Sequence, residues 1–86
     1  MYLHLGQNTI VRDRDIIGIF DLDITSQSLR TRQYLNHAEK AGEVIAVTDD
    51  IPKSFVVTGR RHRQRIYISQ LSTATLLRRS ESSELV

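Results

Sequence analysis

The chain has 86 residues, of which 12 are lysine or arginine and 10 are aspartate or glutamate, for a formal net charge of +2. A chain this short forms one domain and buries only roughly 60–65% of its unfolded surface, so its core is thin. The absence of cysteine excludes disulfide bonds and thiolate metal sites, which leaves association with further copies as the common way to bury more apolar area.

The N-terminal region is typical of a β-hairpin. Residues 2–5 favour a strand, Gly6 or Asn8 suits the positive φ of a short turn, and residues 9–11 resume a strand. A secretory signal would need a basic region and a longer apolar segment, and no apolar run approaches the ~20 residues that cross a bilayer. We therefore expect a soluble, cytoplasmic protein with no membrane partner.

Residues 16–24 form the most apolar run of the chain. Alternation along a strand places Ile17 and Ile19 on one face and Phe20 on the opposite face. Because both faces are largely apolar, the run predicts a central strand covered on both sides, one of them by a neighbouring subunit. The preceding residues 12–15 alternate in charge, which is typical of a solvated corner.

The middle of the chain predicts the longest helix. From Thr25 and Ser26, whose hydroxyls suit an N-cap, the sequence runs to Ala41 without Gly or Pro and with apolar residues at roughly helical spacing. Residues 43–48 fit either a short strand or an extended connection, and a turn follows at residues 49–52.

Residues 55–58 and 65–69 predict two further strands, paired antiparallel around a basic loop at residues 59–64. A short helix follows, capped by Ser72 or Thr73 and ending in cations that suit a helix C-terminus.

These elements together predict a single domain over residues 1–79 and a flexible C-terminal tail over residues 80–86. The fold is predicted to be α+β: a small antiparallel or mixed β-sheet with one long helix and a short C-terminal helix.

The strongest functional feature is the segment from Pro52 to Arg79, which holds seven lysines and arginines and no acidic residue. Four of these cations fall within six residues at the predicted hairpin loop: Arg60, Arg61, Arg63 and Arg65. They are either a solvated charge run or a contact for a polyanion. The second interpretation is favoured because clustered guanidinium groups repel one another, bind phosphate with paired hydrogen bonds, and sit on a ribbon that fits a major groove.

The chain offers no constellation that predicts catalysis. The histidines His4, His37 and His62 fall on different elements, without metal-ligand spacing, and no glycine-rich phosphate loop or nucleophile motif occurs. We therefore predict a non-enzymatic protein with no metal, cofactor or small-molecule substrate. A small enzyme or ligand-binding domain is the least favoured alternative.

Four segments resemble the bacterial extracellular matrix regulators of the RemA/RemB type, and within that family most closely the RemB branch. They are residues 1–6 (MYLHLG), 15–22 (DIIGIFDL), 52–58 (PKSFVVT) and 66–76 (IYISQLSTATL). The resemblance covers nearly the whole chain to residue 79. It implies a cytoplasmic DNA-binding regulator of biofilm-matrix genes, with a LytTR-like fold, assembled into a ring whose arginines contact DNA.

The family's DNA-contacting arginines match this chain only in part. Where the family has an arginine run before the strand that begins at Ser54, only Lys53 keeps a positive charge here. Arg14 is the nearest match to a second family arginine, which precedes the strand beginning at Ile16. The resemblance therefore implies DNA contacts at Lys53 and Arg14, while the residues themselves favour the hairpin loop.

We hypothesise a DNA-binding transcriptional regulator that acts as a ring-like homo-oligomer and presents these basic residues to phosphates of double-stranded DNA. The predicted subunit contacts are Ile17, Ile19 and Leu76. The alternative is an oligomeric protein-interaction or scaffold subunit that binds an acidic protein and no DNA.

Overall fold

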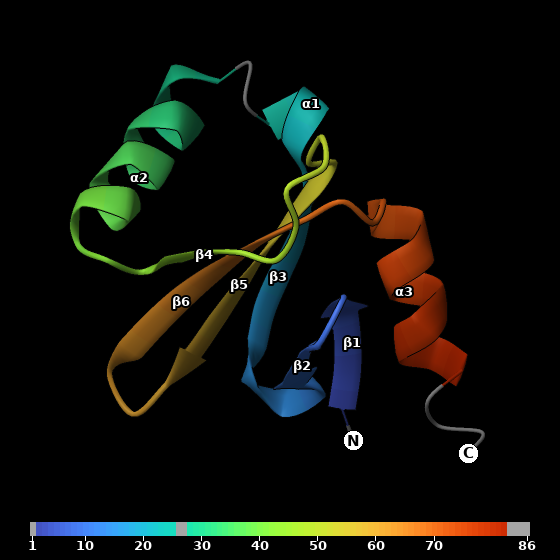
Figure 1. Ribbon diagram of the computed structural model, residues 1–86. Coiled ribbons are helices and arrows are strands. Elements are labelled where there is room, and N and C mark those ends of the chain that lie inside the picture. The colour runs from blue at the N-terminus through green and yellow to red at the C-terminus, as the bar shows by residue number, and fades with distance from the viewer. Residues whose placement is uncertain (1, 26–27, 83–86) are drawn as a thin grey trace.

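A computed structural model describes residues 2–25 and 28–82 (Figure 1). It is an α+β protein with one long helix and a shorter C-terminal helix, as the sequence predicted, and its strands form two sheets where the sequence had predicted one. The elements in chain order are β1 (Tyr2–Gly6), β2 (Thr9–Arg12), the 3-10 helix η1 (Asp13–Asp15), β3 (Ile16–Asp21), α1 (Leu22–Thr25), α2 (Leu29–Lys40), β4 (Val44–Ala46), β5 (Ser54–Arg60), β6 (Arg63–Ser69) and α3 (Thr73–Ser82).

The predicted N-terminal hairpin is confirmed, because β1 and β2 pair antiparallel as a two-stranded sheet. Gly6 and Gln7 take positive φ values of 129° and 43° at its turn. Tyr2 pairs with Arg12 and His4 with Ile10, so these four side chains lie on one face of the hairpin, opposite its buried leucines.

The second sheet is mixed and has the strand order β3-β5-β6-β4. The strands β5 and β6 pair antiparallel at its centre, while β4 runs parallel to β6 and completes one edge. Residues 44–46 therefore form the short strand that the sequence had left undecided.

The prediction of a central strand over residues 16–24 was wrong in two respects, the place of the strand in the sheet and its length. β3 ends at Asp21, and it pairs only with β5, so it is an edge strand. Residues 22–25 turn into α1, where the Leu22 amide donates to the Lys53 carbonyl at 2.9 Å. The apolar residues of this run therefore lie on the two faces of an edge strand, and not of a central one.

A β-bulge between Ile16 and Gly18 explains why Ile17 and Ile19 do not share a face. An extra residue in one strand shifts the alternation of side chains beyond it. Ile19 packs on the core beside α3, whereas Ile17 lies across Gly59 on the opposite side, where an added Cβ would come within 2.7 Å of Ile17 Cδ1. Ile17 is 70% exposed.

Two apolar clusters lie on opposite faces of the four-stranded sheet, and Figure 1 shows α2 on one side and α3 with the β1–β2 hairpin on the other. The buried members of the first cluster, beside β1 and α3, are Leu3, Leu5, Val11, Val47, Val56 and Leu76. The buried members of the second, beside α2, are Ala38, Phe55, Val57 and Ile66.

Two buried serines join the strands to the loop before α3. Ser69 Oγ donates to the Leu5 carbonyl at 2.6 Å and accepts from the Leu71 amide at 3.0 Å. Ser54 Oγ donates to the Leu71 carbonyl at 2.7 Å. These bonds hold β1 and the start of α3 against the central strands.

The helix boundaries differ from the sequence expectation at two ends. α2 begins at Leu29 with Ser28 as its N-cap, while Thr25 belongs to α1 and Ser26 lies outside the described residues. Ser72 caps α3 as predicted, since its Oγ accepts from the Thr75 amide at 3.1 Å. α3 continues through Ser82, so the boundary placed after residue 79 falls inside this helix, and residues 83–86 lie outside the described part.

No helix within the described residues is long and apolar enough to cross a membrane.

Candidate nucleic-acid interface

The β5–β6 hairpin turns on two residues, Arg61 and His62, which take positive φ values of 49° and 67°. Two consecutive residues of positive φ match a type I′ turn, which follows the twist of paired strands. Arg60 pairs with Arg63, so the ladder runs to the turn itself. The predicted loop of residues 59–64 is therefore a two-residue turn, and Arg60 and Arg63 lie on the strands.

The arginines extend a sheet face that begins in the core. Residues two apart on a strand share a face, so Arg63, Arg65 and Tyr67 line up along β6, and Thr58 and Arg65 are paired across the strands. Tyr67 packs against the first apolar cluster. The same face is therefore apolar where the β1–β2 hairpin covers it and strongly basic beyond that cover.

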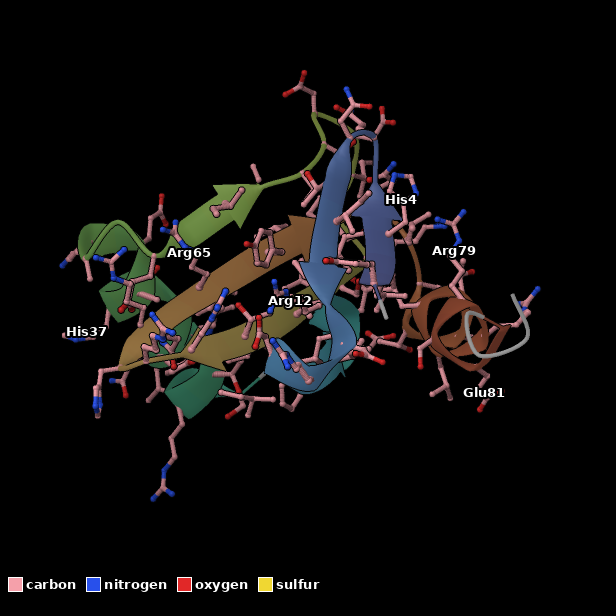
Figure 2. The ribbon with its side chains drawn as sticks, turned by 90° about the horizontal axis from the view of Figure 1, so that it is seen from below. His4, Arg12, His37, Arg65, Arg79 and Glu81 are labelled. Carbon is pink, nitrogen blue, oxygen red and sulfur yellow. The ribbon has the colours of Figure 1, made fainter. Side chains whose placement is uncertain are left out.

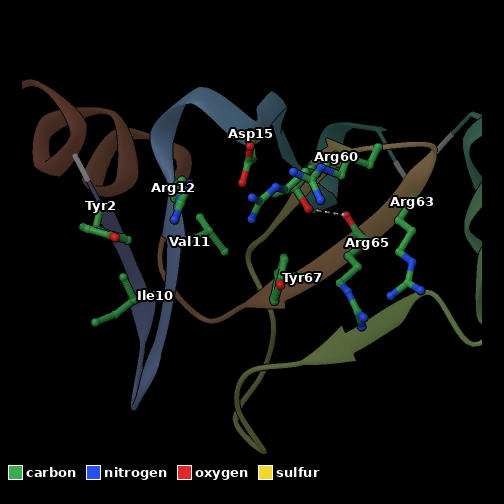
Figure 3. A pocket seen from close by; sticks show the side chains of 11 residues that line it. Tyr2, Ile10, Val11, Arg12, Asp15, Arg60, Arg63, Arg65 and Tyr67 are labelled. Atoms are coloured by element: carbon green, nitrogen blue, oxygen red, sulfur yellow. Dashed lines mark hydrogen bonds between the residues drawn. The ribbon is translucent and has the colours of Figure 1, made fainter.

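This face and the β1–β2 hairpin enclose a depression of about 820 Å³, which we call the arginine recess (Figure 3). Its lining residues are Tyr2, Ile10, Val11, Arg12, Asp15, Thr58, Arg60, Arg61, Arg63, Arg65 and Tyr67. The structure thus brings together all four arginines of the predicted hairpin site and adds Arg12 from β2.

The electrostatics of the arginine recess favour an anion. Within residues 2–25 and 28–82, none of its five guanidinium groups forms an ion pair, and Asp15 supplies the one carboxylate of the lining. The four hairpin arginines are exposed, whereas Arg12 is half-buried. Like charges at close range repel one another, so a bound polyanion would relieve this repulsion as well as form hydrogen bonds.

The two cations implied by the family resemblance are placed differently. Arg14 lies on η1 and lines a shallow depression of about 230 Å³ that shares Tyr2 and Arg12 with the arginine recess. Lys53 lies just before β5, at the far end of the strand from Arg60, and a strand rises about 3.3 Å per residue. Arg14 can join the recess in a single contact surface, while Lys53 is remote from it.

The three predicted subunit contacts also have different surroundings. Leu76 is 0% exposed inside the first apolar cluster, and Ile19 packs against the same cluster. They stabilise the subunit itself and offer little surface to a second copy. Ile17 alone of the three is well exposed.

Ile17 lines an open depression of about 430 Å³ between β3 and α2, which we call the apolar groove. Its lining residues are Ile17, Phe20, Arg30, Thr31, Tyr34, Phe55, Val57 and Gln64. The rings of Phe20 and Phe55 stack with centroids 5.1 Å apart. Because this depression is open, the α2 helix leaves the β3 side of the sheet uncovered.

Tyr34 of α2 has a shifted pKa. Burial, and to a smaller extent the carboxylate of Glu43, raises the pKa of Tyr34 above its ordinary value of 10.0.

The side chain of His4 links β1 to the hairpin turn and to α3. His4 Nε2 donates to the Gln7 carbonyl, so Nδ1 is left to accept from Arg79 Nη1 at 3.4 Å, and Figure 2 shows His4 beside Arg79. Within the described residues no group of three or more histidines and carboxylates is arranged to hold a metal ion.

Sequence reasoning missed two contributors to the recess, Arg12 and Tyr2. Both lie on the hairpin face opposite Leu3 and Val11, and this alternation of exposed and buried positions is readable in residues 2–12. What the sequence does not show is that this hairpin lies beside β6.

Fold and site together define a class: a small α+β protein whose mixed sheet carries an arginine-rich recess at one end. Residues 2–79 match the RemA-like family, described as Extracellular matrix regulatory protein A-like, and the chain belongs to that family. It is 37% identical over 81 residues to Extracellular matrix regulatory protein B of Bacillus subtilis (strain 168), which covers 94% of this chain and 91% of that protein. The family resemblance found in the sequence is confirmed.

Proposed function

We propose that this protein is a non-enzymatic, cytoplasmic DNA-binding transcriptional regulator that controls extracellular-matrix genes. The observation that carries the proposal is the arginine recess, with five guanidinium groups free of ion pairs within the described residues. The name of the relative, Extracellular matrix regulatory protein B, supports the matrix role.

In this proposal the hairpin arginines bind phosphates of double-stranded DNA. Arg61 at the turn and Arg63 beside it are exposed at the end of the ribbon, which can approach a groove flanked by two phosphate backbones. Arg14 extends the same cationic surface along η1. Such contacts fix orientation on DNA without reading its sequence.

A homo-oligomer is the second part of the proposal. The apolar groove is the surface for a neighbouring copy, because Ile17, Phe20 and Tyr34 expose apolar side chains next to the open edge of β3. A ring needs a contact between two different surfaces of the subunit, and it would repeat the arginine recess at regular intervals. Repetition raises the avidity for a long polyanion without any new contact.

The DNA proposal is tested by fluorescence anisotropy with a labelled duplex over a series of salt concentrations. Each phosphate contact contributes about 0.9 to the slope of log affinity against log salt, so changing Arg63 and Arg65 together to Ala should reduce the slope by about 2. The matched control changes Arg32 and Lys40 to Ala, two exposed cations of α2 on the opposite face of the sheet, and should leave the slope unchanged.

The oligomer proposal is tested by light scattering during size exclusion. Ile17→Lys places a charge in the apolar groove and should reduce the mass to that of one chain, while Leu77→Lys, at an exposed position of α3, should not. An oligomer that binds no duplex DNA at low salt would refute the regulator. The interaction or scaffold subunit would then be the remaining interpretation.

A further inference from the structure

The arginine recess has two chemically different halves. The half formed mainly by the β1–β2 hairpin carries Tyr2, Ile10 and Val11 together with the single cation Arg12, and the half near the β5–β6 turn carries the four hairpin arginines. Figure 3 shows Tyr2 and Ile10 on one side, Arg63 and Arg65 on the other, and Tyr67 between them. A ligand that fills the recess must therefore combine an apolar part with a strongly anionic part.

Duplex DNA does not need this combination. Contacts to its backbone use cations on the outer surface, and its bases are stacked and paired inside the duplex. Tyr2 and Tyr67 would therefore make no stacking contact in such a complex. The volume of about 820 Å³ instead lies within the range of roughly 300–1,000 Å³ that is typical of small-molecule sites.

We propose that the arginine recess binds a nucleoside polyphosphate, with its phosphates on the arginines and its base against the tyrosines. Arg12, Arg60 and Arg65 come from three different strands and can surround several phosphate groups, each by paired hydrogen bonds. Because guanidinium groups from three strands line one recess, a ligand with several phosphate groups can contact more of them than a single phosphate can.

The tyrosines suit the base because every base has a face that stacks on an aromatic ring. Tyr67 is held in place by its packing on the first apolar cluster, so its position is fixed before binding. Tyr2 is 61% exposed and lines the same recess, so it can contact the base without disturbing the core. Asp15, the one carboxylate of the lining, can accept hydrogen bonds from ribose hydroxyls, a common role for a carboxylate in nucleotide sites.

The same arginines carry the proposed DNA contacts, so a bound nucleotide would neutralise them and release DNA. This regulatory step rests on the proposed function, whereas nucleotide binding does not. The two are therefore measured separately.

Binding is tested by calorimetry on the full chain with four probes at one ionic strength: GTP, ATP, guanosine and inorganic tripolyphosphate. At least one of the two triphosphates should bind with one molecule per chain and about tenfold more tightly than both guanosine and tripolyphosphate. Equal binding of tripolyphosphate would show a charge effect alone and overturn the proposal. So would binding of oligo(dT) together with failure of both nucleotides, because the recess would then be a single-strand site.

Variants locate the nucleotide. Tyr2→Ala should weaken binding about fivefold or more through the lost stacking contact, and Arg65→Ala about tenfold, while Arg32→Ala on α2 should have no effect. Unchanged affinity in both recess variants would place the ligand elsewhere and refute the assignment. Circular dichroism verifies that each variant is folded.

The regulatory step is tested by adding GTP or ATP, whichever binds more tightly in the calorimetry, to the protein–duplex complex. Release of the duplex at nucleotide concentrations that saturate the recess is the expected result, and simultaneous binding of both would refute competition. If no duplex binds at all, the proposed function fails while the calorimetric result still decides whether the recess takes a nucleotide.

Discussion

Replacing His62 with glycine should stabilise the protein. His62 is the second turn residue of the β5–β6 hairpin, with φ of 67°, and its exposed side chain makes no hydrogen bond within the described residues. Type I′ turns favour glycine at this position because it adopts positive φ without a clash of its Cβ. The substitution removes backbone strain and loses almost no packing.

The magnitude follows from two opposing terms. A non-glycine residue in the left-handed region costs roughly 1–2 kcal/mol, while glycine loses more backbone entropy on folding, by roughly 0.5–1 kcal/mol. The net gain is about 0.5–1 kcal/mol. For a domain of this size 1 kcal/mol corresponds to about 4–8 °C in Tm, so His62→Gly should raise Tm by about 2–8 °C.

Thermal unfolding followed by circular dichroism measures this effect. His62→Ala is the matched control, because it removes the same imidazole but keeps a Cβ at positive φ, and its Tm should not rise. A Tm gain of equal size in His62→Ala would mean that the side chain, and not the backbone, was responsible. A lower Tm in His62→Gly would contradict the strain argument directly.

Three further predictions concern the core, the buried serines and the apolar groove. Leu76→Ala should lower the free energy of unfolding by about 2–5 kcal/mol in urea titrations, since Leu76 is fully buried, whereas Leu77→Ala beside it should cost far less. Ser69→Ala should lower this free energy by about 2–4 kcal/mol, because the Leu5 carbonyl and the Leu71 amide lose their partner; the exposed Gln33→Ala should have no such effect. Because the pKa of Tyr34 is raised in the folded state, stability should fall as pH rises above the unfolded value of about 10, and Tyr34→Phe should flatten that decline. An equally steep decline in Tyr34→Phe would assign the effect to another group.

Local patterns in the sequence predicted most elements of the fold correctly. The two antiparallel hairpins, the long helix and the Ser72 cap depend on residues close together in the chain. The position of β3 does not, because whether a strand is central or at an edge is decided by which distant strands join the sheet. β4 joins next to β6, which leaves β3 at the opposite edge.

The candidate site, too, combines residues that are close in the sequence with residues that only the fold brings together. The four hairpin arginines are close in sequence, so their clustering could be predicted. Arg12 could not be added to them, because it reaches the recess only when the β1–β2 hairpin packs beside β6, fixed in part by the Ser69–Leu5 hydrogen bond across 64 residues. The bulge after Ile16 likewise places Ile17 and Ile19 on opposite faces, and no residue pattern in that run marks it.

The hydrogen bond between Ser69 and Leu5 also constrains when the molecule can fold during translation. The first apolar cluster combines Leu3 and Leu5 with Leu76, so it cannot close until residues near 76 have been synthesised. Chains grow at about 5–20 residues per second, which keeps the leucines of the first hairpin without their final neighbours for several seconds. During that interval a nascent chain exposes them to chaperones, and the arginine recess does not yet exist.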